Sequence, residues 1–110
     1  MAEPTLVQIF GIGTTQDATT LTIPKSALSS TNLTASANNT AESLLTAIVM
    51  KAKEYLTPDN HDANLDQSLI ITDGYLPTIV LRGTAKYSQD TFTIALEKPL
   101  GNTAINPNDY

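Results

Sequence analysis

The clearest periodic pattern in the chain is an apolar stripe at helical spacing within residues 40–56. Its members recur three or four positions apart and fall on one helical face: Ala41, Leu44, Leu45, Ile48, Ala52, Tyr55 and Leu56. Asn39 is placed to act as the N-cap, and Thr57-Pro58 ends the helix because proline cannot continue the hydrogen-bond ladder. We therefore expect one amphipathic helix that packs this stripe on a sheet.

Strand patterns precede this helix. Residues 5–12 are rich in β-branched and aromatic types, and residues 18–23 alternate Thr with apolar side chains. Both runs are predicted to be strands, joined as a hairpin. Residues 25–39 are rich in Ser, Thr and Asn and are expected to form a long loop that Leu28 and Leu33 pin to the core.

After the helix, an acidic loop is expected at residues 58–67, and three strand patterns follow. They lie at residues 69–72, at residues 77–87 with a bulge at Gly83, and at residues 91–97. Residues 88–90 are expected to turn the chain. In the last strand, the alternation predicts that Phe92, Ile94 and Leu96 face inward.

The predicted order of elements is therefore β-β-α-β-β-β. Short links between strands favour antiparallel pairing. The fold class predicted is α+β, a two-layer arrangement of a mainly antiparallel sheet with one amphipathic helix packed on one face. Residues 1–98 are expected to form a single domain, and residues 99–110 a polar tail that is either disordered or docked on a partner.

Composition narrows the classes of partner. The net charge of −5 disfavours phosphate backbones and anionic lipid, so neither nucleic acid nor membrane is expected as a partner. The chain has no cysteine, which excludes disulfides, thiolate catalysis and cysteine-based metal sites. Residues 1–4 are acidic where a secretory signal would be basic, so the expected location is the cytoplasm or a particle assembled there.

The 62–73 segment carries a weak calcium-type pattern. Asp62, Asn64 and Asp66 alternate as oxygen ligands of a calcium loop do, and Asp73 stands where the last ligand would lie. Gln67 occupies the position that needs glycine, and a strand pattern follows instead of a helix. The alternative interpretation is a solvated loop in which Asp and Asn support turns.

Catalytic patterns are weak, and we expect neither an enzyme nor a cofactor. His61 is the only histidine and could act as a general base only with a nucleophile and a second titratable group beside it. Asp59 and Asp62 are its neighbours in sequence. Residues 11–13 resemble the start of a phosphate loop but lack the third glycine and the helix that such a loop requires.

By elimination, the sequence favours a non-enzymatic structural or interaction protein that assembles with itself or with another protein. Exposed strand edges need covering, and symmetric pairing is the common solution. Subunits of larger particles, phage-derived ones among them, share this composition. If Val49 and Met50 prove exposed beside the stripe, they mark where a second copy sits. Three tyrosines are candidate contact residues: Tyr75, Tyr87 and Tyr110.

The alternative function is a small ligand-binding or regulatory module. It would use the loops at residues 25–38 and 58–67 to hold its ligand, with cations or basic segments favoured by the acidic charge.

Overall fold

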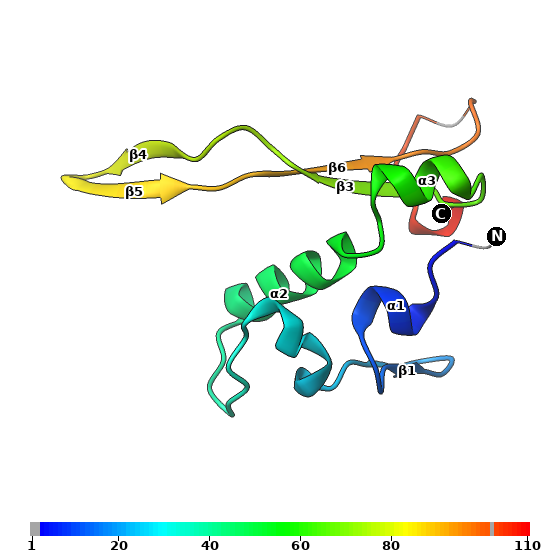
Figure 1. Cartoon of the computed structure of the whole chain (residues 1–110), viewed down its shortest axis with the longest axis horizontal. Helices are drawn as coiled ribbons and strands as arrows, with labels where there is room; N and C mark the ends of the chain where they lie inside the picture. Colours follow the sequence, from blue (N-terminus) through cyan, green and yellow to red (C-terminus); the bar gives the residue numbers. More distant parts are fainter. Residues whose placement is uncertain (1–2, 102) are drawn as a thin grey trace.

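A computed structural model describes residues 3–101 and 103–110 and shows an α+β fold with antiparallel sheets, which confirms the predicted class (Figure 1). The helices are α1 (Leu6–Phe10), α2 (Ala41–Lys53) and α3 (Pro58–Ala63), with 3-10 helices η1 (Lys25–Thr31) and η2 (Pro107–Asp109). The strands are β1 (Thr15–Gln16), β2 (Leu21–Thr22), β3 (Leu69–Asp73), β4 (Thr78–Arg82), β5 (Ala85–Gln89) and β6 (Phe92–Leu96).

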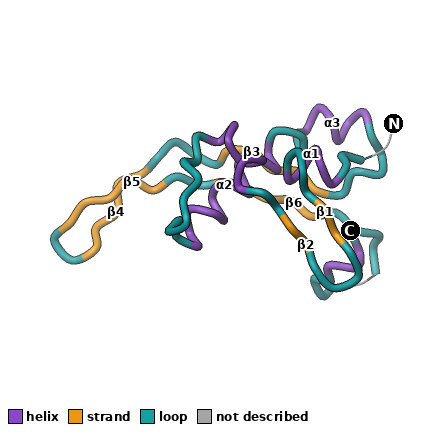
Figure 2. The backbone as a smooth tube through the Cα atoms, turned by 90° about the horizontal axis from the view of Figure 1, so that it is seen from below, coloured by secondary structure: helices purple, strands orange, loops and turns teal. Residues whose placement is uncertain are grey.

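Strands β3 to β6 form one long hairpin in two segments (Figures 1 and 2). The inner segment pairs β3 with β6, from Leu69 opposite Leu96 to Asp73 opposite Phe92. The outer segment pairs β4 with β5, and we call this hairpin, residues 78–89, the arm. Between the two segments the backbones stay connected, because the Gly74 amide donates a 2.8 Å hydrogen bond to the Thr91 carbonyl.

The arm projects from the rest of the molecule (Figure 1). Within the described residues, β4 and β5 pack extensively only against each other. The molecule measures 47 × 33 × 26 Å, and its radius of gyration is 16.2 Å, whereas a compact chain of this length would have about 13 Å. The fold is therefore elongated, with helices clustered beside the inner segment.

The core is small and lies where α2 meets β3. Ala52, Leu56 and Ile71 are buried together, and Ile9 and Leu69 pack against them. Other contacts of α2 run to α1 and η1, so only part of its stripe faces a strand. Three stripe residues expected in the core are exposed instead, namely Ala41, Leu45 and Tyr55.

The first predicted strand, residues 5–12, is wrong: this run forms helix α1. Thr5 and Gln8 build a capping box, in which Thr5 Oγ1 accepts from the Gln8 amide and the Gln8 side chain accepts from the Thr5 amide. The helix ends at Gly11, whose φ of 103° suits glycine. Local capping and packing against α2 thus override the β propensity of the run.

The prediction at Gly83 is also wrong. Gly83 and Thr84 form a two-residue turn between β4 and β5, with Gly83 at φ 64°, and so residues 85–87 run back antiparallel instead of continuing β4. Ser88 and Gln89, expected in a turn, belong to β5.

Both predicted loops around α2 contain helical turns, and the caps of α2 differ from expectation. Thr40 rather than Asn39 caps α2, because its hydroxyl accepts from the Ser43 amide. Thr57-Pro58 begins α3: Thr57 Oγ1 accepts from an amide in the first turn, and Pro58 occupies the position where no amide is needed. The 58–67 segment is therefore a short helix followed by a turn.

Truncation of the core tests this packing. Leu56→Ala is expected to lower the free energy of unfolding by about 2–5 kcal/mol, because it removes apolar contacts and leaves a cavity against Ile71. Leu65→Ala is the matched control, since Leu65 is 99% exposed, and it should change stability by less than about 0.5 kcal/mol. Urea unfolding followed by circular dichroism measures both. Equal effects of the two substitutions would contradict the placement of the core.

Candidate functional site

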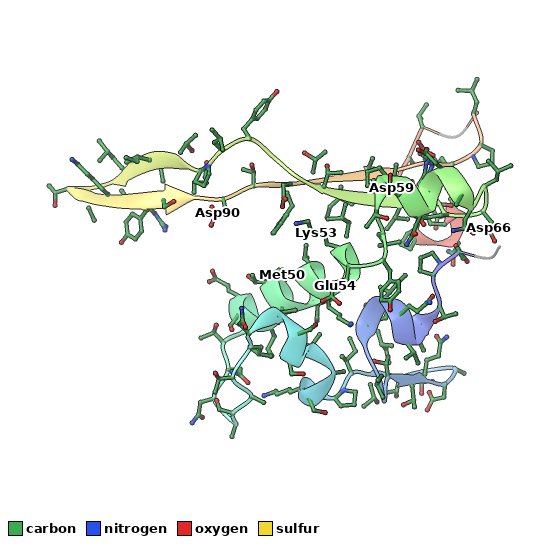
Figure 3. All side chains as sticks on the ribbon, in the orientation of Figure 1. Met50, Lys53, Glu54, Asp59, Asp66 and Asp90 are labelled. Atoms are coloured by element: carbon green, nitrogen blue, oxygen red, sulfur yellow. The ribbon has the colours of Figure 1, made fainter. Side chains whose placement is uncertain are left out.

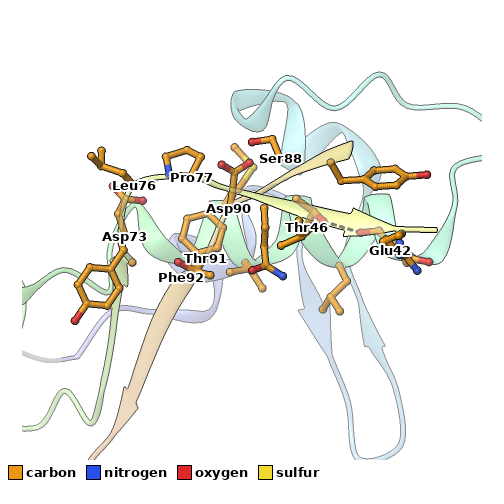
Figure 4. A pocket seen from close by; sticks show the side chains of 18 residues that line it. Glu42, Thr46, Asp73, Leu76, Pro77, Ser88, Asp90, Thr91 and Phe92 are labelled. Atoms are coloured by element: carbon orange, nitrogen blue, oxygen red, sulfur yellow. Dashed lines mark hydrogen bonds between the residues drawn. The ribbon is translucent and has the colours of Figure 1, made fainter. Parts of the chain in front are cut away.

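A groove with a volume of about 1130 Å³ lies between α2 and the arm (Figure 4). We call it the α2–arm groove. Its apolar lining comes from α2, the arm, β6 and the segment between β3 and β4. These residues are Leu45, Val49, Met50, Val80, Tyr87, Phe92, Tyr75, Leu76 and Pro77. Val49 and Met50 are only partly exposed there, and Val49 also packs against the core, so their role as a contact surface stays a prediction.

Charged groups rim this groove. Glu42, Asp90 and Asp73 bring carboxylates to it, and Arg82 brings a guanidinium. The Asp73 carboxylate is engaged, because Lys53 Nζ donates to its Oδ1 at 2.6 Å. Carboxylates thus outnumber the basic groups that line the groove, so it suits a partner surface that is apolar and basic.

Arginine and lysine also contact the aromatic rings of the groove. Arg82 lies 5.5 Å from the centre of the Tyr87 ring, and Lys53 Nζ lies 5.3 Å from that of Phe92. Such cation–π contacts hold a ring in place without covering its other face. Tyr87 remains 49% exposed and Phe92 38% exposed, so both rings are available for further contact.

Exposed apolar side chains gather around the arm. Ile79 and Leu81 lie on β4, and Tyr75 and Leu76 lie in the segment that precedes it; all four are largely exposed. Phe92, Ile94 and Leu96, predicted to face inward, share a face with buried Ile71 but keep about two-fifths of their surface. The inner segment is therefore covered on its β3 side and open on its β6 side.

The four metal candidates lie in different surroundings; Figure 3 labels one of them, Asp66. Asp62 is exposed, whereas Asn64 is buried in the turn after α3. Asp66 accepts a 3.0 Å hydrogen bond from the backbone amide of Glu3, and Asp73 forms an ion pair with Lys53, the last residue of α2. No group of three or more His, Asp or Glu side chains within the described residues is placed to hold a metal ion. Calcium binding at these positions stays a prediction.

His61 is part of a structural link. Its Nε2 lies 2.6 Å from Glu97 Oε1, just beyond β6, and its Nδ1 lies 3.8 Å from Asp62 Oδ1. The first contact ties α3 to the end of β6. Asp59, the other neighbour in sequence, lies in the first turn of α3, where a negative charge is favoured.

The 25–38 segment folds on itself and packs on α2. Leu28 is buried, as predicted, and Leu33 is partly buried. Lys25 Nζ donates to the Ser36 carbonyl at 2.7 Å, which closes the loop. Ser30 Oγ donates to the Glu54 carboxylate at 2.7 Å and joins η1 to the end of α2.

A second hollow of about 310 Å³ lies between α1, the start of β3 and Tyr110. Gln67 lines it, is 2% exposed, and donates through Nε2 to the Leu69 carbonyl at 2.8 Å, while its Oε1 has no hydrogen-bond partner. The tail returns to this region through η2, where Asp109 Oδ2 lies 4.0 Å from Lys98 Nζ. The described part of the tail therefore docks on its own chain.

None of the helices within residues 3–101 and 103–110 is long and apolar enough to cross a membrane. No family model, curated protein or solved structure matches the chain. The features that bear on function are therefore the exposed side chains and the two hollows of the structure itself.

The Ser30–Glu54 contact gives stability a pH dependence. The hydrogen bond from Ser30, with a smaller contribution from Lys51 at 3.1 Å, holds the pKa of Glu54 below its usual 4.5. A lowered pKa means that the ionised group stabilises the fold above its ordinary pKa, and that this contribution is lost as pH falls through the lowered value. Because the side chain is 39% exposed, Glu54→Gln should cost less than about 1 kcal/mol near pH 7.

The difference between Glu54→Gln and the unchanged protein should shrink as the pH falls through the lowered pKa of Glu54, because the protonated carboxyl group is neutral, as the amide is. Urea unfolding at pH 7 and at progressively lower pH measures it, and Glu3→Gln, at an exposed carboxyl, is the matched control. A difference that persists at the lower pH would contradict the role given to the ionised carboxylate.

Proposed function

We propose that this chain is a non-enzymatic structural building block that assembles with copies of itself. The observation that carries the proposal is its surface. The accessible area is 8232 Å², whereas a compact monomer of 11.7 kDa would expose about 5,900 Å². The excess of roughly 2,300 Å² has to be stabilised by something other than the chain's own core.

The arm is one of the exposed parts of the molecule. All five residues of β5 are exposed, and in β4 only Val80 is partly buried. An isolated two-stranded hairpin is marginally stable in water, and monomers rarely expose large apolar patches. A partner surface that covers the arm would supply the missing burial.

The size of the excess fits protein association. A standard interface takes about 800 Å² from each partner, and obligate ones take up to about 2,500 Å². Several of the charged side chains that might serve catalysis are paired in links between elements, as in His61–Glu97 and Lys53–Asp73. These pairings support a structural role over acid–base chemistry.

Small-ligand binding is the second candidate, and the hollow at Gln67 favours it. Its volume of about 310 Å³ is at the lower end of the roughly 300–1,000 Å³ of ligand pockets. The free Gln67 Oε1 would accept a hydrogen bond from a donor group there. The 25–38 loop is closed by Lys25 and packs on α2, so it gives less support for ligand binding than this hollow does.

Oligomeric state tests the proposal. Size-exclusion chromatography with light scattering, run at tens of micromolar, is expected to give a mass that is a multiple of 11.7 kDa. Serial dilution should reveal dissociation, because association follows mass action. A mass of one chain at every concentration would contradict the proposal. Lysozyme of known monomeric mass, run in the same buffer, controls for column effects.

A further inference from the structure

The two faces of the arm differ in what covers them. Successive side chains of a strand point to opposite faces. Val80 and Tyr87 pair across the strands and line the α2–arm groove of their own chain. Ile79 and Leu81 therefore point to the other face, where they are 77% and 67% exposed. We call this the outer face of the arm.

In the described part of the chain, the α2–arm groove keeps apolar side chains exposed. Leu45 stands on its α2 wall and is 62% exposed. The volume of about 1130 Å³ exceeds the roughly 300–1,000 Å³ that encloses a small molecule. A polypeptide segment with apolar side chains fits such a groove better than a single small ligand does.

The charges of these two surfaces are complementary. The arm carries Arg82 and Lys86 and no acidic residue, although the chain as a whole has a net charge of −5. Lys86 lies opposite Leu81 on the outer face, whereas the groove presents the carboxylates of Glu42, Asp73 and Asp90 against the single guanidinium of Arg82. Opposite charge favours contact between the outer face and the groove, and like charge disfavours contact between two outer faces.

The excess area also favours two different surfaces on each copy. One standard interface covers about 800 Å² of a chain, which leaves most of the roughly 2,300 Å² excess exposed. If each copy gives its arm to one neighbour and its groove to another, about 1,600 Å² of each chain is covered.

We infer that the outer face of the arm of one copy docks in the α2–arm groove of a second copy, with Ile79 and Leu81 against Leu45 and Lys86 near Glu42 and Asp90. This inference rests on the proposed self-assembly and specifies its geometry. Such contacts are head-to-tail, so the assembly closes as a ring or extends as a filament.

Single cysteines placed in this cysteine-free chain test the docking. Leu81→Cys and Ile79→Cys mark the arm, Leu45→Cys marks the groove, and Leu65→Cys, at a 99% exposed position away from both, measures chance collisions. A disulfide requires Cα atoms within about 7 Å. Under mild oxidation, a mixture of an arm variant with Leu45→Cys is expected to give a mixed disulfide dimer well above the Leu65→Cys background, seen on a non-reducing gel and by mass spectrometry.

The possible outcomes separate the docking from the assembly. Arm-to-arm disulfides without mixed ones would overturn the groove docking and leave self-assembly intact. Cross-linking no stronger than the Leu65→Cys background, in a protein that is oligomeric by light scattering, would also overturn the docking alone. A wild-type chain that is monomeric throughout would overturn both.

Complementation provides a test that needs no cross-link. The arm variant Ile79→Ser/Leu81→Ser and the groove variant Leu45→Lys should each be monomeric, with circular dichroism confirming that each is folded. Mixed in equal amounts they should form a heterodimer, because one copy keeps its arm and the other its groove. A folded arm variant that stays fully assembled, or a mixture that stays monomeric, would overturn the docking.

Discussion

The contact of Leu56 with Ile71 joins the helical half of this protein to its β hairpin. The two side chains are buried together with Ala52, and the Ile71 amide donates a 2.8 Å hydrogen bond to the Leu56 carbonyl. Through α2 this junction holds α1 and η1, and through β3 it holds β6. The arm follows from β3 and β6, because Gly74 and Thr91 continue the hairpin outward.

A junction this small leaves the protein with little interior. Its buried apolar side chains are few, and large ones stay exposed along the arm and the open side of the inner segment. Burial of apolar area supplies most of the stability of a domain. A small core therefore stabilises the isolated chain little, and the proposed assembly would add to this stability by burying more apolar area. This small core links the fold to the proposed assembly.

Polar contacts serve mainly to tie elements together. Ser30 and Glu54 join η1 to α2, while Lys53 and Asp73 join α2 to β3. These contacts lie between elements near the surface, where each contributes modestly to stability. The angle between α2 and the hairpin is what creates the α2–arm groove (Figure 4).

The sequence alone determined the α+β class, the presence of α2 and the positions of β3, β4 and β6, because long periodic patterns depend on local geometry. It did not decide residues 5–12, since a short apolar run suits a strand or a helix until the Thr5–Gln8 caps and the α2 surface select one. Gly83 was ambiguous because a bulge and a tight turn use the same residue, and only the pairing partner of β4 distinguishes them. Tertiary structure alone decided the groove: Leu45 carries the pattern of a core residue, but the arm runs past α2 without packing on it, and so the side chain stays open to a partner.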